Sequence, residues 1–107
     1  MNPPSDPDYS DLAALDRLIH EPARLAIMAV LAGCESADFE FLRNATGLTK
    51  GNLSAHAIKL EQGGYLTVEK GFQGKRPYTR YRLSSTGRAA LKEYRERLKK
   101  TLNGMKE

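Results

Sequence analysis

The chain has 107 residues, of which 40% are hydrophobic and 28% are charged, so we expect one folded domain rather than a disordered or membrane-spanning chain. Its formal net charge is +4, from 17 basic and 13 acidic side chains. There is one cysteine, Cys34, and there are two histidines, which excludes an intramolecular disulfide and gives no metal-ligand spacing. We therefore expect no metal and no cofactor.

The positive charge is unevenly distributed along the sequence. Residues 1–48 hold three basic and eight acidic side chains, residues 49–82 hold seven and two, and residues 83–107 hold seven and three. A basic second half fits a chain that meets a polyanion, although a basic surface that only maintains solubility would give the same charge. Charge alone leaves the partner open.

The N-terminal residues 1–9 are predicted to form a flexible tail, because their prolines and aspartates offer nothing to bury. They also lack the basic-then-apolar order of a signal peptide. The longest apolar run, residues 25–32, is too short to span a bilayer. We expect a cytoplasmic protein with no membrane partner.

Two helices are predicted next. Leucines and Ile19 recur at helical spacing over residues 10–19, which predicts an amphipathic helix. The second helix is predicted from Pro22, which suits a first helical turn, to Gly33, which ends it. Because it is apolar nearly all round, we expect it to be the central helix of the core.

A third helix is predicted over residues 39–46, with Asp38 as its N-cap and Gly47 at its end. The side chains expected to face inward are Phe39, Leu42 and Ala45. The short link "GLT" then leads into a fourth helix.

The fourth helix is predicted over about residues 50–62, between the N-cap Thr49 and the pair Gly63-Gly64. Leu53, Ala57 and Leu60 fall in one narrow sector, which is predicted to be buried. The opposite face is made of small or hydrogen-bonding residues with one larger side chain; these are Gly51, Asn52, Ser54, Ala55, Ile58 and Lys59, with Lys50 beside the cap. His56 lies beside the buried sector, and we assign it no chemistry.

Such a face is typical of a helix that enters a DNA groove. Short side chains let the backbone approach base edges, Asn can bind adenine, and a helix N-terminus attracts phosphate. An ordinary solvated first turn is the alternative, but there Gly51 would cost roughly 1 kcal/mol relative to Ala. The candidate DNA-binding residues of this helix are Thr49, Lys50, Gly51, Asn52, Ser54, Ala55 and Lys59.

A β-hairpin is predicted after the fourth helix. Residues 65–72 and 78–84 carry β-branched and aromatic residues at alternating positions, and "QGKRP" between them marks a turn. The hairpin is basic, with Lys70, Lys75, Arg76, Arg80 and Arg82. Its candidate DNA-binding residues are Gln73, Lys75, Arg76 and Arg80, on a wing over about residues 71–78 that contacts the backbone or a minor groove. The alternative is that these charges only guard an exposed strand edge.

The last helix is predicted over about residues 84–105, with Ser84 or Ser85 as its cap. Its apolar stripe is longer than one small core needs, so we expect a dimerisation helix, although a helix packed wholly on its own domain is the alternative. The candidate dimer-interface residues are Leu12, Leu15, Leu91, Tyr94, Leu98 and Leu102.

The order of these elements defines a fold class. Four helices, two strands and a last helix give an α+β, mainly α, winged helix-turn-helix domain over residues 10–107. In such a domain the fourth helix crosses the third, so that its outer face can enter a major groove about 12 Å wide.

The sequence resembles a known family through "IHEPARLAIMAVLAG" and "TGLTKGNLSAHAIKLEQGGYL". Over about residues 16–98 it is similar to winged-helix transcriptional regulators of the MarR and ArsR types. The resemblance implies a homodimer that binds double-stranded DNA, with the helix from Lys50 in the major groove and residues 71–78 as the wing. The cysteine pairs with which many ArsR-type proteins bind metal are absent, and the resemblance implies no particular effector.

We therefore favour a sequence-specific transcriptional regulator, a repressor more than an activator. The alternative from another class is a winged-helix protein-interaction module without direct DNA binding, although such a helix would expose apolar anchors and here only Ile58 qualifies. We expect no enzyme and no catalytic residues, because no nucleophile, carboxylate pair or phosphate loop has the required spacing. Cys34 is expected to be an inert structural cysteine.

Overall fold

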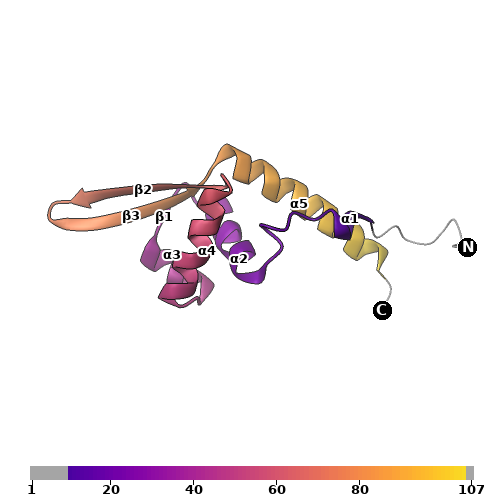
Figure 1. Cartoon of the computed structure of the whole chain (residues 1–107), viewed down its shortest axis with the longest axis horizontal. Helices are drawn as coiled ribbons and strands as arrows, with labels where there is room; N and C mark the ends of the chain where they lie inside the picture. The colour runs from indigo at the N-terminus through magenta and orange to yellow at the C-terminus, as the bar shows by residue number, and fades with distance from the viewer. Residues whose placement is uncertain (1–9, 106–107) are drawn as a thin grey trace, which may run out of the picture.

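The computed structural model describes residues 10–105, and the predicted tail over residues 1–9 lies outside this range. The described part forms five helices and three strands (Figure 1). In chain order they are α1 (Ser10–Ala13), α2 (Pro22–Ala32), β1 (Ala37–Asp38), α3 (Phe39–Thr46), α4 (Lys50–Gln62), β2 (Leu66–Gln73), β3 (Arg76–Leu83) and α5 (Ser85–Gly104). This confirms the predicted, mainly helical winged helix-turn-helix architecture. None of the described helices is long and apolar enough to cross a membrane.

The three strands form one antiparallel sheet in the order β1-β3-β2. β2 and β3 pair along their whole length, from Leu66 opposite Leu83 to Gln73 opposite Arg76. The turn between them is therefore only Gly74-Lys75, tighter than the predicted five-residue turn, and Gly74 has the positive φ of 65° that such turns require. β1 was not predicted, because two residues are too few to show an alternating pattern.

The first helix is shorter than predicted, since α1 ends at Ala13 rather than at residue 19. The Asp16 carboxylate accepts hydrogen bonds from the backbone N–H of Leu18 at 2.8 Å and of Ile19 at 3.2 Å. A side chain that satisfies nearby N–H groups in this way competes with helix formation. Leu15 and Ile19 are nevertheless buried, so the pattern identified their environment but not their backbone conformation.

The core is centred on α2, which contacts α3, α4, β3 and α5. The largest fully buried side chains are Ile19, Ile27, Met28, Leu31, Leu42, Leu53 and Leu60. On α3 the prediction for Ala45 is wrong, because that residue is exposed. The inward-facing sector of α3 contains Phe39, Leu42 and Thr46. At 100° per residue, Ala45 lies outside this sector.

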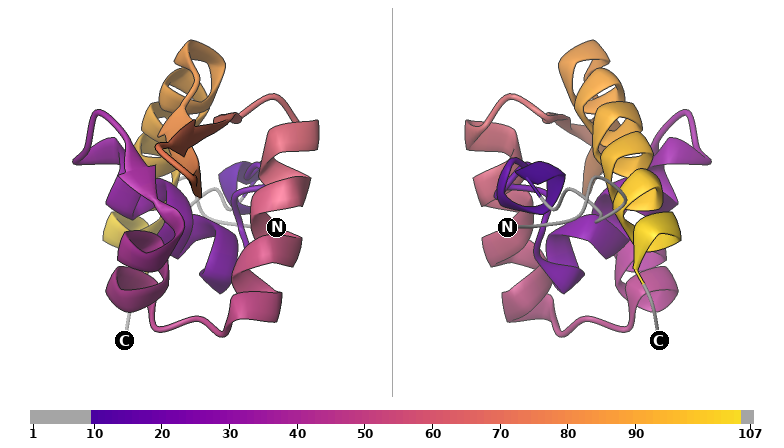
Figure 2. Two further views of the ribbon diagram at one scale, coloured as in Figure 1. Left: turned by 90° about the vertical axis from the view of Figure 1, so that its left-hand side faces the viewer. Right: turned by 90° about the vertical axis from the view of Figure 1, so that its right-hand side faces the viewer.

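The last helix, α5, begins where the chain folds back on itself. Ser84 is its N-cap, and its hydroxyl accepts a hydrogen bond from the N–H of Gly87 at 2.9 Å. A Cβ on Gly87 would lie 2.2 Å from the carbonyl oxygen of Tyr65, so glycine is needed for this close approach. From there α5 runs to the end of the molecule opposite the hairpin, with α1 alongside it (Figures 1 and 2).

Candidate nucleic-acid interface

The helix α4 is anchored on one face and open on the other. Leu53, Ala57 and Leu60 are buried, as predicted. The Thr49 hydroxyl accepts a hydrogen bond from the N–H of Asn52 at 3.2 Å, which confirms the predicted N-cap. The opposite face is exposed along the whole helix; its residues are Lys50, Gly51, Asn52, Ser54, Ala55, Ile58 and Lys59.

Gly51 has no structural requirement within the described residues. A Cβ built on it would meet no atom within 4 Å, and its φ is not in the left-handed region. Alanine would therefore fit and would favour the helix. The glycine leaves a stretch of α4 backbone bare at the exposed N-terminal turn.

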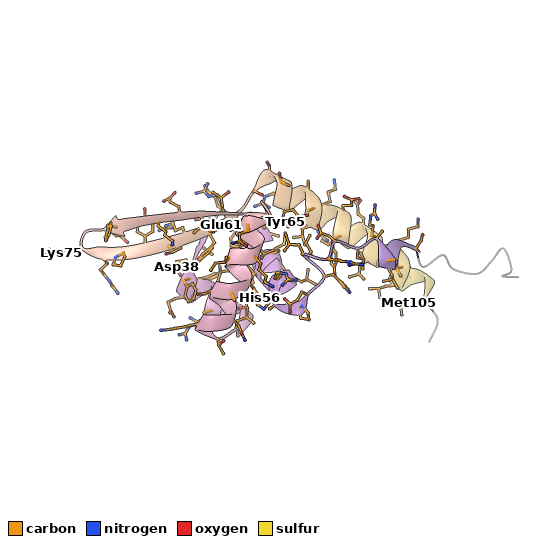
Figure 3. All side chains as sticks on the ribbon, viewed as in Figure 1. Asp38, His56, Glu61, Tyr65, Lys75 and Met105 are labelled. Carbon is orange, nitrogen blue, oxygen red and sulfur yellow. The ribbon has the colours of Figure 1, made fainter. Side chains whose placement is uncertain are left out.

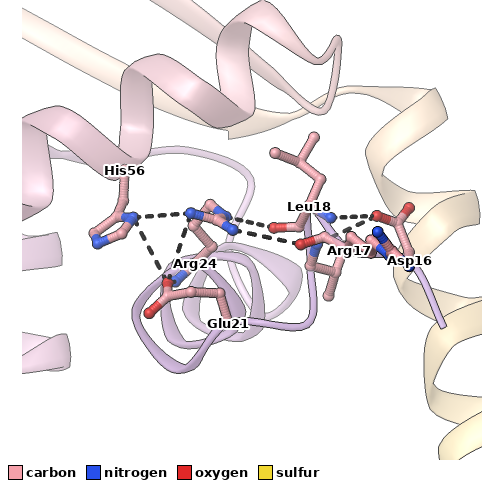
Figure 4. A network of polar contacts seen from close by, with 7 residues as sticks. Asp16, Arg17, Leu18, Glu21, Arg24 and His56 are labelled. Atoms are coloured by element: carbon pink, nitrogen blue, oxygen red, sulfur yellow. Dashed lines mark hydrogen bonds and ion pairs between the residues drawn. The ribbon is translucent and has the colours of Figure 1, made fainter. Parts of the chain in front are cut away.

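A polar network joins α4 to the start of α2 (Figure 4). Arg24 donates to the Nδ1 atom of His56 at 3.2 Å and to the carbonyl oxygen of Leu18 at 2.5 Å. Because a guanidinium has no acceptor, the His56 nitrogen is the acceptor in this contact. His56 is thus a partly buried, hydrogen-bonded side chain, and it holds α4 in place from the inner side.

Glu21 completes this network. Its carboxylate accepts from the N–H of Arg24 at 2.9 Å as the N-cap of α2, and it lies 3.6 Å from the Nδ1 atom of His56. The backbone hydrogen bond from Arg24 holds the pKa of Glu21 below its ordinary value. The carboxylate therefore stays ionised 3.9 Å from the Arg24 guanidinium, and Arg24 links the N-terminus of α2 to His56 on α4.

The β2–β3 hairpin projects beyond the helices, with Lys75 at its tip (Figures 1 and 3). Residues 66–83 contain five basic side chains and one acidic side chain, Glu69. Of the candidate wing residues, Gln73 and Arg76 face each other beside the turn, and Arg80 lies nearer the body, opposite Glu69. The candidates are thus spread from the tip of the hairpin towards its base.

The outer part of the hairpin is organised around Tyr78. A Cβ on the opposing Gly71 would lie 2.7 Å from the Tyr78 hydroxyl, so glycine leaves room for the ring. The hydroxyl donates to Glu69 at 3.2 Å, and the Arg80 guanidinium carbon lies 5.6 Å from the ring centroid. Such a cation–π contact restricts the Arg80 side chain without neutralising its charge.

Tyr65 lies at the junction of α4 and β2, and its side chain forms a hydrogen bond with the loop after α1. Its hydroxyl donates a short hydrogen bond to Asp16, the residue whose carboxylate ends the first helical segment. This hydrogen bond, with a smaller effect from burial, raises the pKa of Tyr65 to about 12. The junction of helix and hairpin is therefore tied to the N-terminal segment.

The six candidate dimer residues fall into two groups. Leu15, Leu91 and Tyr94 are buried within the chain itself. Leu12 and Leu102 are 39% and 54% exposed, and Leu98 is partly buried. Leu98 and Leu102 line a groove along α5 together with four charged residues, which are Lys92, Arg95, Glu96 and Lys99.

Two residues of the hairpin surface were not predicted from the sequence. Phe72 and Tyr78 were seen only as members of an alternating pattern, and only the length of the hairpin shows that they lie beyond the body. Over residues 10–105, no group of three His, Cys, Asp or Glu side chains could hold a metal ion.

Comparisons with known proteins place this chain in a family. Residues 23–102 match the family described as winged helix DNA-binding domain. The uncharacterised protein MJ0432 of Methanocaldococcus jannaschii is 33% identical over 78 residues, which cover 73% of this chain and 85% of that protein. A transcriptional regulator homologue from Pyrococcus horikoshii OT3 is 28% identical, with a TM-score of 0.83, and the match covers 89% of this chain and 96% of that chain.

A mutant of MarR from E. coli, solved in complex with operator DNA, has the same fold. It is 14% identical, with a TM-score of 0.66, and the match covers 89% of this chain and 73% of that chain. The chain therefore belongs to the winged helix DNA-binding domain family and has the fold of MarR-type transcriptional regulators.

Proposed function

We propose that this chain is a sequence-specific regulator of transcription that binds double-stranded DNA as a homodimer. The exposed face of α4 enters the major groove, and the wing over residues 71–78 follows the backbone or a minor groove. We expect repression rather than activation, so a reporter behind the bound promoter should become more active when the gene for this chain is deleted.

The observation that carries the proposal is the bare N-terminal turn of α4. Gly51 has no packing partner and no unusual φ, so its cost to the helix is not offset within the described residues. A helix that must bring its backbone close to base edges gives this glycine a purpose. Asn52, Ser54 and Ala55 on the same exposed face then lie where base edges would be read.

Charge supports the same surface. Lys50 and Lys59 lie on the exposed face of α4, and Lys75, Arg76 and Arg80 lie on the hairpin. Phosphate neutralisation by such residues supplies much of the affinity of a DNA-binding protein and makes it depend on salt. Phosphate contacts position the protein, whereas base contacts give sequence preference.

The first test is fluorescence anisotropy with a duplex of about 30 bp from upstream of the chain's own gene, which can hold two half-sites about one helical turn apart. Saturable binding that exceeds binding to a scrambled duplex, and that weakens steeply with salt, is the expected result. Failure to bind either duplex at low salt would contradict the proposal and would favour a protein partner.

The second test separates base readout from general affinity. Asn52→Ala should weaken binding to the preferred duplex by about 1–3 kcal/mol and change binding to the scrambled duplex little. Gln62→Ala, at the other end of α4, removes an exposed amide outside the reading turn and is the matched control. Equal losses on both duplexes for Asn52→Ala would remove this residue as a base reader.

The homodimer would form through the exposed apolar residues of α1 and α5. Leu12 and Leu102 are exposed and Leu98 is partly buried, so these three side chains offer apolar surface to a partner. The other candidate residues are buried and stabilise the monomer. Leu102→Asp should convert a sedimenting dimer to a monomer without unfolding it, because that side chain is half exposed. Wild-type protein that sediments only as a monomer at micromolar concentration would contradict the dimer.

A further inference from the structure

The tip of the hairpin presents an apolar side chain that nothing in the described part of the chain covers. Phe72 is 74% exposed, more than any other large hydrophobic side chain between residues 10 and 105. A folded domain does not need an isolated phenyl ring at the end of a basic hairpin for its own stability. The ring is therefore available for an external contact.

The register explains why the ring is free. Alternation places Phe72 on the same face of β2 as Leu66 and Val68, which pack on the core near the base of the hairpin. The third strand, β1, pairs with β3 only as far as Arg80. Beyond that point the hairpin is a two-stranded ribbon that leaves the body (Figure 1), so the core face of the sheet continues into open space.

Pro77 lies directly opposite Phe72 in the register, and both side chains are exposed. Side chains of such a cross-strand pair share one face and lie close together. Proline has a fixed φ and phenylalanine has only two side-chain torsions, so the pair forms a stiff apolar point with little entropy to lose. A stiff point of two residues is suited to insertion rather than to forming a broad docking face.

The charges around this point indicate what it enters. Lys70 lies on the same face as Phe72 and Lys75 is in the turn, whereas Arg76 and Glu69 lie on the other face, where Glu69 accepts the Tyr78 hydroxyl. An apolar point with basic side chains on both faces of the ribbon and in its turn complements a polyanion with an apolar layer between its phosphates. The DNA minor groove has this composition, because phosphates border the groove and sugars and stacked bases form its walls and floor.

We propose that Phe72, supported by Pro77, is a wedge that enters the minor groove beside the α4 site and partly unstacks one base step. The surrounding basic residues neutralise the phosphates at the edges of the groove. Pyrimidine–purine steps are the easiest to unstack, so the wedge would add a preference for TA or CA/TG at positions that α4 does not touch. This inference rests on the proposed DNA-binding function.

The test uses the bound duplex of about 30 bp with 2-aminopurine in place of one adenine at a time along the flank, because the fluorescence of this base rises when it unstacks. Wild-type protein at saturation should raise the fluorescence at one step of each flank. Phe72→Ala should bind about tenfold more weakly and lose the rise even at saturation. Phe72→Leu, which keeps an apolar wedge, should retain the rise.

Phe41→Ala is the matched control, since Phe41 is another half-exposed phenylalanine but lies on α3. It should keep both the affinity and the fluorescence rise. A wild-type complex without a fluorescence rise at any position would overturn the wedge but not the proposed DNA binding. A Phe72→Ala variant that keeps both its affinity and the fluorescence rise would do the same. The hairpin tip would then be a candidate for a protein contact. Wild-type protein that binds no duplex would overturn the wedge together with the proposed function.

Discussion

The helix α4 and the outer half of the β2–β3 hairpin are both proposed to contact DNA, yet they are held in place by different means. α4 has three buried side chains on its inner face, a capped N-terminus and the contact of His56 with Arg24. In contrast, no residue between positions 67 and 80 of the hairpin is buried. The position of the helix is therefore set by the core, whereas the hairpin tip, as far as residues 10–105 show, is positioned without buried side chains and mainly by cross-strand contacts.

This difference separates two kinds of substitution. A change on the inner face of α4 alters the stability of the whole domain, because the domain core is also the anchor of the helix. A change at the hairpin tip alters only what the tip touches. A hairpin-tip residue whose substitution unfolds the domain would contradict this distinction.

Leu53→Ala should have the largest effect on stability. Leu53 is fully buried, so its truncation should remove about 2–5 kcal/mol from the free energy of unfolding. Phe72→Ala should change the free energy of unfolding by less than about 0.5 kcal/mol, because substitutions of exposed side chains outside the core usually have effects of this size. Urea denaturation of the two variants beside the wild type measures both values, and similar losses would contradict the distinction between core-held helix and free tip.

Tyr65→Phe tests the junction between the two regions. Loss of the hydrogen bond to Asp16 should cost about 1 kcal/mol at neutral pH. Because the folded pKa of about 12 exceeds the ordinary value of 10.0, this stability is fully present below about pH 10 and is lost as the pH rises through about 12. Unfolding free energies measured across that window should decline less in Tyr65→Phe than in the wild type, and equal declines would show that the hydroxyl contributes nothing.

Gly51→Ala tests whether the exposed N-terminal turn of α4 has a role in DNA binding. The new methyl group meets no atom within 4 Å, so the variant should be more stable by about 0.5–1 kcal/mol. If the bare backbone approaches base edges, the same variant should bind the preferred duplex more weakly. Thermal melting and anisotropy on one preparation test both directions, and a variant that gains stability without losing affinity would leave the glycine without a DNA role.

Much of the fold could be predicted because its signals are local. The caps Asp38, Thr49 and Ser84, and the glycines that end α3 and α4, set helix boundaries that the structure confirms. The exception is α1, where the Asp16 carboxylate binds two N–H groups and stops the helix despite a helical apolar pattern. Periodicity predicted the burial of Leu15 and Ile19 correctly, but Leu12 of the same pattern is exposed, and periodicity could not detect a competing side-chain acceptor.

The candidate site was harder to predict from the sequence than the fold, because the exposure of several of its residues depends on tertiary packing. The inner and outer faces of α4 follow from the 100° spacing of Leu53, Ala57 and Leu60. The exposure of Phe72, however, depends on where the third strand stops pairing with β3, and β1 is a two-residue strand without a pattern of its own. Likewise, Leu91 and Tyr94 share a stripe with Leu102, and only the tertiary packing separates the buried members from the exposed one.

Lys75→Ala should have the smallest effect and completes the comparison from the hairpin side. Lys75 lies in the turn, exposed and outside the core, so the free energy of unfolding should not change. As a phosphate contact, its loss should weaken binding about equally on preferred and scrambled duplexes and should reduce the magnitude of the salt slope by about 1. Lys100→Ala, at an exposed position of α5, is the control and should leave the slope unchanged. If Lys75→Ala instead weakened only the preferred duplex, the tip would read sequence through its charge, and the division between an anchored reading helix and a phosphate-following tip would have to be redrawn.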